Sequence, residues 1–276
     1  MNDIRKWNPE LKGDVIREGE YLRIYARTPQ RPLKKMTYVV KKGDTLGAVS
    51  KKLKVPVKEL MKINKLKVGD ELVYYSHSVV EKSSSIGSCA SGRLENGEMM
   101  PSGKGFSTSG RANIFGTNET VANILKCLKK FRSKYPKAPP VLIGDLSKKG
   151  GGELPPHVSH QSGRDVDIGY APKDGKHLDW FKDFKPSEID MDKSWFLIKC
   201  FLEMKDTQMI FMDYPLQEHF YNFLKKKKVS KKLLRKYFQF PGGPDADIGM
   251  IRHSKGHYSH FHVRFKCAKG DKGCVK

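Results

Sequence analysis

With 276 residues, the chain is long enough for a small domain and a medium one, and its 38% hydrophobic content excludes a disordered protein. No run of about 18 apolar residues occurs, so the sequence predicts no transmembrane segment. Lys and Arg outnumber Asp and Glu by 53 to 30, which gives a net charge of +23. Most of the basic residues are Lys dispersed along the chain, and no nucleic-acid-binding module is recognisable. The charge therefore favours anionic wall polymers or lipid headgroups over nucleic acid as partners.

The first 35 residues echo the second half of the unit that follows them. The segments at residues 7–9 and 19–24 resemble those at residues 63–64 and 69–72. Half of such a unit cannot bury its own apolar face, so residues 1–35 are predicted to be a truncated repeat and a connector. The N-terminus also lacks the apolar stretch of a signal peptide, and we expect an export signal upstream of this chain.

Residues 36–75 show the pattern of a strand, two short helices and a second strand, a βααβ unit. Asp44 or Thr45 can cap the first helix, Pro56 separates it from the second, and Gly69 precedes the last strand. The unit resembles LysM modules in the motif Tyr-Val-Val-x-x-Gly-Asp-Thr-Leu, followed downstream by Leu60, Asn64, Gly69 and Leu72. The resemblance implies a module that binds glycans containing N-acetylglucosamine.

A polar, Ser-rich stretch at residues 76–86 is predicted to be a flexible linker to a second domain, residues 87–276. Helical and strand patterns alternate along this domain, so the whole chain is predicted to be α+β. The expected elements are a helix around residues 121–128, a strand at 141–143, a helix at 195–204, a strand at 209–212, a basic helix at 224–237 and a last strand at 261–265.

Five cysteines leave at least one thiol unpaired within the chain. Cys267 and Cys274 close a short polar loop, and we predict a disulfide between them, which would persist in an oxidising compartment. Cys127 and Cys200 lie in apolar helical patterns and are predicted to be buried free thiols. The sequence gives no placement for Cys89.

Five of the nine histidines fall into two clusters that lie far apart in the sequence. In an extended strand alternate side chains share a face, so His260 and His262 point one way, as do Asp165 and Asp167 on another strand. Two imidazoles and a carboxylate suit zinc, whereas magnesium or calcium would require mostly oxygen ligands. We therefore predict that zinc is bound by His160, Asp167 and His262.

Hydrolysis of an amide also needs a group that accepts a proton and one that donates it. The His-Glu-x-x-His arrangement, in which the glutamate is the base, is absent from the sequence. His260 shares a strand face with His262, and His257 lies on the turn before that strand. We predict that His257 and His260 are the general base and the stabiliser of the transition state, and the sequence leaves open which is which.

The second domain resembles the penicillin-insensitive murein endopeptidases in two motifs. The first is His-x-Ser-His-Gln-x-Gly-x-Asp-Val-Asp-Ile at residues 157–168, and the second is His-x-x-His-x-His-Val-Arg at residues 257–264. The resemblance implies a zinc peptidase with a central antiparallel sheet flanked by helices, and it implies the same ligands and catalytic histidines as above. It also points to a second, peripheral metal site at His157, Asp174 and His177.

We therefore predict that the chain hydrolyses the peptide cross-links of peptidoglycan, specifically the D-alanyl to meso-diaminopimelyl bond, in the periplasm or outside the cell. The LysM-like unit would hold the glycan while the second domain acts on the stem peptides. The Lys-Thr-Gly element of penicillin-binding proteins is absent, which argues against a serine acyl-enzyme. Two alternatives stay open: a non-catalytic peptidoglycan-binding protein, and a carboxypeptidase or amidase on the same scaffold.

Overall fold

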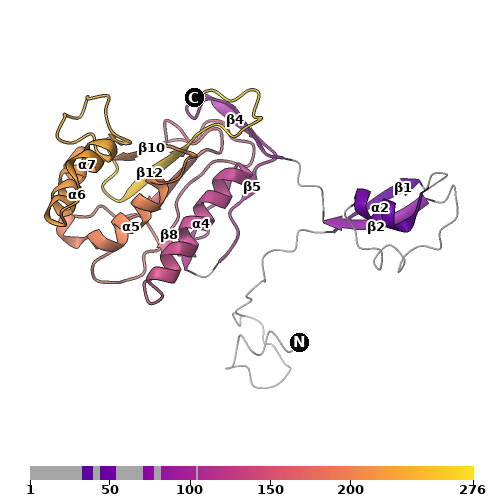
Figure 1. Cartoon of the computed structure of the whole chain (residues 1–276), viewed down its shortest axis with the longest axis horizontal. Coiled ribbons are helices and arrows are strands. Elements are labelled where there is room, and N and C mark those ends of the chain that lie inside the picture. Colours follow the sequence, from indigo (N-terminus) through magenta and orange to yellow (C-terminus); the bar gives the residue numbers. More distant parts are fainter. Residues whose placement is uncertain (1–32, 40–43, 54–70, 78–81, 104) are drawn as a thin grey trace, which may run out of the picture. The chain divides into compact units, whose positions relative to one another are not determined.

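The computed structural model of the chain describes residues 33–39, 44–53, 71–77, 82–103 and 105–276 (Figure 1). The chain divides into two compact units, Met1–Glu81 and Lys82–Lys276. Helices and paired strands occur in both, so the predicted α+β class is confirmed. Among the described residues, no helix is both long enough and apolar enough to cross a membrane.

The described part of the N-terminal unit is a strand pair and one helix, β1 (Leu33–Val39), α2 (Leu46–Leu53) and β2 (Glu71–His77). The strands run antiparallel, with Val39 opposite Glu71. The Thr45 hydroxyl accepts a hydrogen bond from the backbone N–H of Ala48 at 3.2 Å, so one of the two predicted caps satisfies an open donor in the first helical turn.

Two predictions for this unit concern residues outside the described chain, and a third differs from the structure. The predicted second helix, with Leu60 and Ile63, lies outside the described residues, and so do residues 1–32 of the predicted truncated repeat. Residues 33–35, predicted as a connector, belong to β1.

The C-terminal unit is built on a four-stranded sheet in the order β11-β10-β12-β9. Its strands are β9 (Asp165–Gly169), β10 (Thr207–Met212), β11 (Ile251–His253) and β12 (His260–Phe265). β12 is antiparallel to both of its neighbours, and β11 joins β10 in parallel at one edge. The predicted antiparallel centre is therefore present, with one parallel strand added.

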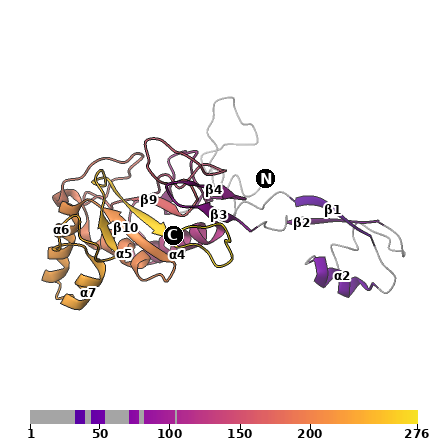
Figure 2. The same ribbon diagram turned by 90° about the horizontal axis from the view of Figure 1, so that it is seen from above.

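Four helices accompany this sheet, α4 (Asn118–Lys134), α5 (Met191–Leu202), α6 (Tyr214–Lys226) and α7 (Lys231–Tyr237). Figures 1 and 2 show α4 beside α5, and α6 beside α7. One buried cluster joins the predicted apolar face of α4, including Ile124, to the inner face of β12, including Phe261 and Val263. The core thus lies between these helices and the sheet.

The prediction of a single basic helix at residues 224–237 is wrong, because the structure has two helices there. α6 ends at Lys226, and Lys228 adopts a positive φ of 60°. The Ser230 hydroxyl accepts the backbone N–H of Leu233 at 3.3 Å and starts α7. A serine side chain that caps a new helix competes with continuation of the old one, which apolar periodicity alone does not reveal.

Short strands and one 3-10 turn complete the unit. They are β3 (Ser84–Gly87), β4 (Gly92–Glu95), β5 (Glu98–Met99), β6 (Phe106–Ser107), β7 (Phe115–Gly116), β8 (Val141–Leu142) and η1 (Pro186–Glu188). β3 pairs with β4, β5 with β7, and β6 with β8. Residues 84–86, predicted to be linker, therefore belong to a hairpin of the C-terminal unit.

Arg164, just before β9, is almost fully buried, with 1% of its surface exposed. Its Nε donates to the Ser85 hydroxyl at 2.9 Å, and its terminal nitrogens donate to the carbonyls of Phe265 and Val275 at 3.1 and 2.8 Å. Three acceptors satisfy most of the guanidinium donors, which a buried cation requires. One side chain therefore connects the first hairpin, the end of β12 and the C-terminal segment.

Two disulfides stabilise the unit. The predicted bond between Cys267 and Cys274 is present, which confirms that prediction. The prediction of free thiols at Cys127 and Cys200 is wrong, because these residues form a disulfide that joins α4 to α5. Helical periodicity identified both as buried but could not show that they face each other. Cys89 is a buried free thiol.

Candidate active site

The two central strands bring the predicted site residues together. In the pairing of β12 with β9, His262 lies opposite Asp167, Arg264 opposite Asp165, and His260 opposite Gly169. The side chains of Phe261, Val263 and Phe265, between these polar residues, are buried in the core. This is the alternation that the sequence predicted for β12, and it places the polar residues on one face of the sheet.

Three buried polar atoms converge on one point of that face. The Asp167 Oδ1 atom lies 3.2 Å from His160 Nε2 and 3.3 Å from His262 Nδ1. Among the described residues, His160 Nε2 and Asp167 Oδ1 are buried without a hydrogen-bond partner. Buried polar atoms are rarely left in this state, because each loses its hydration without compensation. The two imidazoles and the carboxylate therefore fit a metal ion in donor type and in burial.

The backbone and a carbonyl fix the orientation of His160. Its Nδ1 donates to the carbonyl oxygen of Leu146 at 2.8 Å, so Nε2 is the nitrogen that faces Asp167. Its backbone N–H donates to Asp165 Oδ2 at 3.0 Å. The residue also adopts a positive φ of 67°, which is rare outside glycine and costs local strain.

Asp165 does not face the convergence point but holds the residues that do. Arg264 donates from Nε to Asp165 Oδ1 at 2.9 Å and from Nη2 to Oδ2 at 3.3 Å. Asp165 Oδ1 also lies 3.0 Å from His262 Nε2. Burial opposes ionisation of Asp165, but the charges of His262 and Arg264 hold its pKa well below the usual range. It is therefore a charged residue that positions both His160 and His262, the two histidines of the predicted ligand set.

The protonation of His160 follows from the carboxylate at the centre of the site. Burial alone would favour neutral groups, but the neighbouring His160 and His260 hold the pKa of Asp167 well below its usual range. Against the same burial, the charge of Asp167 raises the pKa of His160 to about 9. The His160 imidazole is therefore protonated on both nitrogens at neutral pH, and a metal that binds at Nε2 would displace the Nε2 proton.

His157 also lies near this point, although the sequence placed it in a second site. His157, His160 and Asp167 form a group whose potential ligand atoms all lie within 4.8 Å of one another. His157 Nε2 lies 3.3 Å from Asp145 Oδ2, and His157 Nδ1 lies 3.9 Å from Asp167 Oδ2. His157 is 27% exposed, whereas His160 and Asp167 are almost fully buried.

The other residues of the predicted second site lie elsewhere in ion pairs. Asp174 pairs with Lys176 at 3.5 Å, and His177 pairs with Asp179 at 3.1 Å. Within the described part of the chain, no group of potential metal ligands contains Asp174 or His177. The structure therefore groups His157 with the first site instead.

The two predicted catalytic histidines stand beside the ligands. His260 Nε2 lies 3.6 Å from Asp167 Oδ1, and the rings of His257 and His260 are 4.9 Å apart between centroids. His257 Nδ1 donates to the Ser254 carbonyl at 3.0 Å, which leaves its Nε2 as a proton acceptor. Burial lowers the pKa of His257 and lowers that of His260 to about 4, so both rings are neutral at pH 7.

One wall of the site was not predicted from the sequence. The Phe181 ring stacks on His260, with centroids 4.6 Å apart and planes 14° apart. The Arg111 guanidinium lies 5.0 Å from the Phe181 ring and 5.3 Å from the Trp180 ring, and it pairs with Asp145 at 3.2 Å. Trp180 is 66% exposed. An aromatic pair within a charged, non-periodic stretch was the available signal for this wall.

Comparisons with known proteins identify the families that the two units resemble. A family model described as penicillin-insensitive murein endopeptidase matches residues 85–276, and a LysM domain model matches residues 38–73. A protein of Haemophilus influenzae named penicillin-insensitive murein endopeptidase is 28% identical over 207 residues, which cover 67% of this chain and 64% of that protein. The chain thus spans somewhat less than two thirds of the length of this curated relative.

Proposed function

Because the chain belongs to the penicillin-insensitive murein endopeptidase family, we propose that it hydrolyses peptide cross-links of peptidoglycan with the help of one bound metal ion. The observation that carries this proposal is the convergence of His160 Nε2 and His262 Nδ1 on Asp167 Oδ1, where His160 Nε2 and Asp167 Oδ1 are buried without hydrogen-bond partners. The name of the Haemophilus influenzae relative supports the same activity.

The proposed metal is zinc, held by His160, Asp167 and His262. Two nitrogen donors and one oxygen donor favour zinc over magnesium and calcium, which prefer oxygen. When bound, zinc would act as a Lewis acid toward the scissile carbonyl and its attacking water. We prefer His262 to His157 as the third ligand, because His262 is 6% exposed with its Nδ1 3.3 Å from Asp167 Oδ1, whereas His157 is 27% exposed with its Nδ1 3.9 Å from Asp167 Oδ2.

We propose that His257 is the general base and that His260 stabilises the developing charge. His257 has a free Nε2 lone pair, because its Nδ1–H is engaged by the Ser254 carbonyl. Its position is supported by Asp213, which accepts the His257 backbone N–H at 2.5 Å, and by Tyr170, whose hydroxyl donates to the His257 carbonyl at 3.2 Å. A base held in this way loses little orientation entropy when the substrate reacts.

The proposed substrate is the cross-linked stem peptide, and the proposed bond joins D-alanine to meso-diaminopimelate. A LysM domain that bound the glycan would keep the second unit at the polymer and raise its effective concentration there. Such a substrate places the protein in the periplasm or outside the cell, and the two disulfides are in keeping with an oxidising compartment.

Digestion of purified murein tests the reaction directly. We expect mass spectrometry of the products to show cross-linked dimers converted to monomers by the zinc-loaded protein. A His257→Ala variant should lose this activity, while His219→Ala, an exposed histidine of α6, should retain it. Loss of terminal alanine alone would indicate a carboxypeptidase, release of whole stem peptides an amidase, and unchanged muropeptides a non-catalytic binder.

Gly144 is expected to be essential for the wall formed by Phe181. A Cβ at this position would lie 2.5 Å from two Phe181 ring carbons and 2.9 Å from Asp167 Cβ. Gly144→Ala should displace the ring and the ligand, and lower kcat by about 10²-fold, as small misplacements of catalytic groups do. Gly150→Ala is the matched control, since no atom lies within 4 Å of a Cβ there. Equal kcat values for the two variants would contradict this role.

A further inference from the structure

A dense group of basic residues covers the end of α6 and the whole of α7. Within residues 225–236, every Lys and Arg is exposed, and the nearest acidic residues along the chain are Glu218 and Asp245. We call this surface the basic patch. It consists of Lys225, Lys226, Lys227, Lys228, Lys231, Lys232, Arg235 and Lys236.

The basic patch is barely neutralised by the rest of the protein. In the described chain, the only ion pair of the basic patch joins Lys227 to Asp192. Most of these like charges therefore repel one another in the free protein, a cost that a bound polyanion would remove. The C-terminal end of α6 offsets part of the repulsion, because the helix dipole favours cations there.

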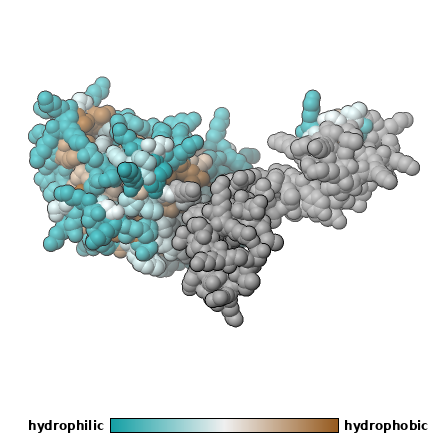
Figure 3. Space-filling model, turned by 90° about the horizontal axis from the view of Figure 1, so that it is seen from below, coloured by the Kyte–Doolittle hydropathy of each residue, from teal (hydrophilic) through white to brown (hydrophobic). Residues whose placement is uncertain are grey.

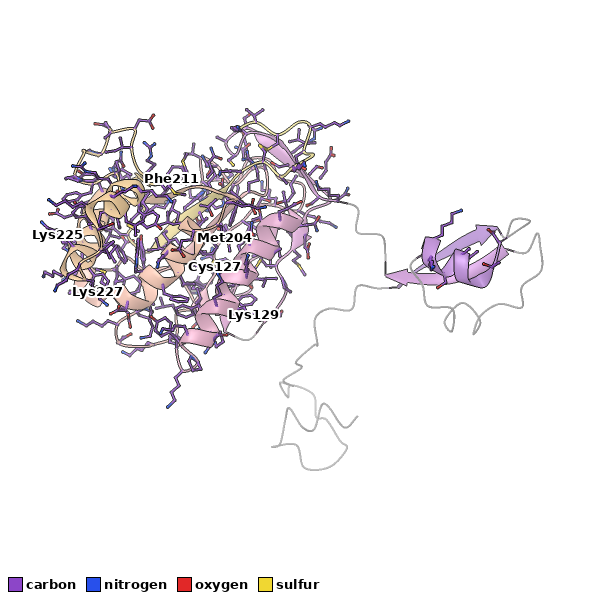
Figure 4. The ribbon with its side chains drawn as sticks, in the orientation of Figure 1. Cys127, Lys129, Met204, Phe211, Lys225 and Lys227 are labelled. Carbon is purple, nitrogen blue, oxygen red and sulfur yellow. A yellow bond between two sulfur atoms is a disulfide. The ribbon has the colours of Figure 1, made fainter. Side chains whose placement is uncertain are left out.

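The basic patch lies away from the catalytic residues. α6 starts at Tyr214, next to Asp213, which accepts the backbone N–H of His257. From Tyr214 to Lys225, the first member of the basic patch, α6 rises by about 17 Å. In Figure 4, Lys225 and Lys227 lie at the end of α6 while Lys129 lies on α4. A ligand held at this end of α6 would therefore lie away from the predicted catalytic histidines.

The side chains of the basic patch indicate what kind of anion it would bind. Seven of its eight members are Lys, whose ammonium groups act as hydrated point charges and suit phosphate oxygens without reading a fixed geometry. The nearby aromatic rings are not fully exposed, since Phe223 is half-buried and Tyr237 is buried. The basic patch thus lacks the exposed rings on which nucleic-acid bases stack.

A membrane surface fits the basic patch less well. Leu224 and Leu234 are buried, and no member of α6 or α7 is among the exposed large hydrophobic residues. Helices that bind lipid interfaces present an apolar face for insertion as well as charge. Hydrophilic residues also predominate over the visible described face of the C-terminal unit in Figure 3.

We propose that the basic patch is a second polymer-binding site, which holds a phosphodiester-linked anionic polymer of the cell wall. This partner rests on the proposed function only for its location, because binding does not require cleavage. The basic patch would restrain the C-terminal unit on the anionic component of the wall while the active site acts on the peptide component.

The test compares two variants with the same change in charge. In the first, Lys225, Lys226, Lys231 and Lys232 are replaced by Gln, and in the second, the exposed Lys126, Lys129, Lys130 and Lys134 of α4 are replaced by Gln. Binding of poly(glycerol phosphate) is measured by titration at several salt concentrations. We expect the first variant to lose affinity by about tenfold or more and its salt slope to fall by about 3. The second variant should bind nearly as the unmodified chain does.

Each other outcome overturns a stated part of the proposal. Equal losses in the two variants would mean that net charge, and not the basic patch, attracts the polymer. Tighter binding to single-stranded DNA or to anionic phospholipid vesicles than to poly(glycerol phosphate) would overturn the choice of partner. Cleavage of soluble muropeptides should be unchanged in the first variant, so a failure of the catalytic proposal stays distinguishable from a failure of this one.

Discussion

Replacing His160 with alanine is expected to abolish binding of the proposed zinc ion and to lower kcat/KM for cross-linked peptides by about 10³-fold or more. A metal ion that polarises the scissile carbonyl contributes several kcal/mol to catalysis, and each 1.4 kcal/mol corresponds to about tenfold in rate. His160 is the ligand with the most complete support, from the Leu146 carbonyl at Nδ1 and from Asp165 at its backbone N–H. The measurement is zinc content together with the rate on purified muropeptide dimers.

Zinc content of further variants separates ligands from catalytic residues. We expect His262→Ala to lose the metal and His157→Ala to keep it. His257→Ala should retain zinc but lose activity, because His257 acts on the substrate and does not hold the metal. Zinc lost from His157→Ala and retained by His262→Ala would replace our ligand set with the group of His157, His160 and Asp167. Full activity after exhaustive chelation would refute the metal-dependent reaction altogether.

Removing the disulfide between α4 and α5 is expected to lower the free energy of unfolding by about 4 kcal/mol. Cys127 and Cys200 are 73 residues apart, so the bond constrains a long loop in the unfolded chain. The double variant Cys127→Ala and Cys200→Ala would be compared with the unmodified chain in denaturant titrations. A loss of this size is comparable with the whole stability of many domains.

The second disulfide supplies the matched control. Cys267 and Cys274 are only 7 residues apart, and the same relation gives about 2 kcal/mol for their bond. The two double variants should therefore differ by about 2 kcal/mol in the free energy of unfolding. If the C-terminal pair were the more stabilising, the loop-entropy account would fail for this protein.

The strand-borne part of the site was predictable because strand geometry is regular. Alternation along β12 placed His260, His262 and Arg264 on one face, and the same rule placed Asp165 and Asp167 on one face of β9. Which strands pair, and in which register, depends on contacts distant in sequence. The direct pairing of His262 with Asp167 is therefore information that only the structure supplies.

The residues outside regular elements were harder to anticipate. His160 has a positive φ and is oriented by Leu146 in another segment, which no local pattern encodes. Phe181 lies in a stretch without helix or strand, and its position depends on the space left by Gly144. Whether Cys127 and Cys200 face each other likewise depends on how α4 packs against α5, and apolar periodicity does not determine this packing.

The hydrogen bonds of Arg164 connect residues 273–275 to the start of β9, the strand that carries Asp167. Arg164 immediately precedes Asp165, and it is tied to the carbonyl of Val275, 111 positions away. Gly87 strengthens the same attachment, since its carbonyl accepts the backbone N–H of Val275 at 2.9 Å. Residues 273–275 therefore support the start of β9, and a change that removes them would act on the strand that carries Asp167.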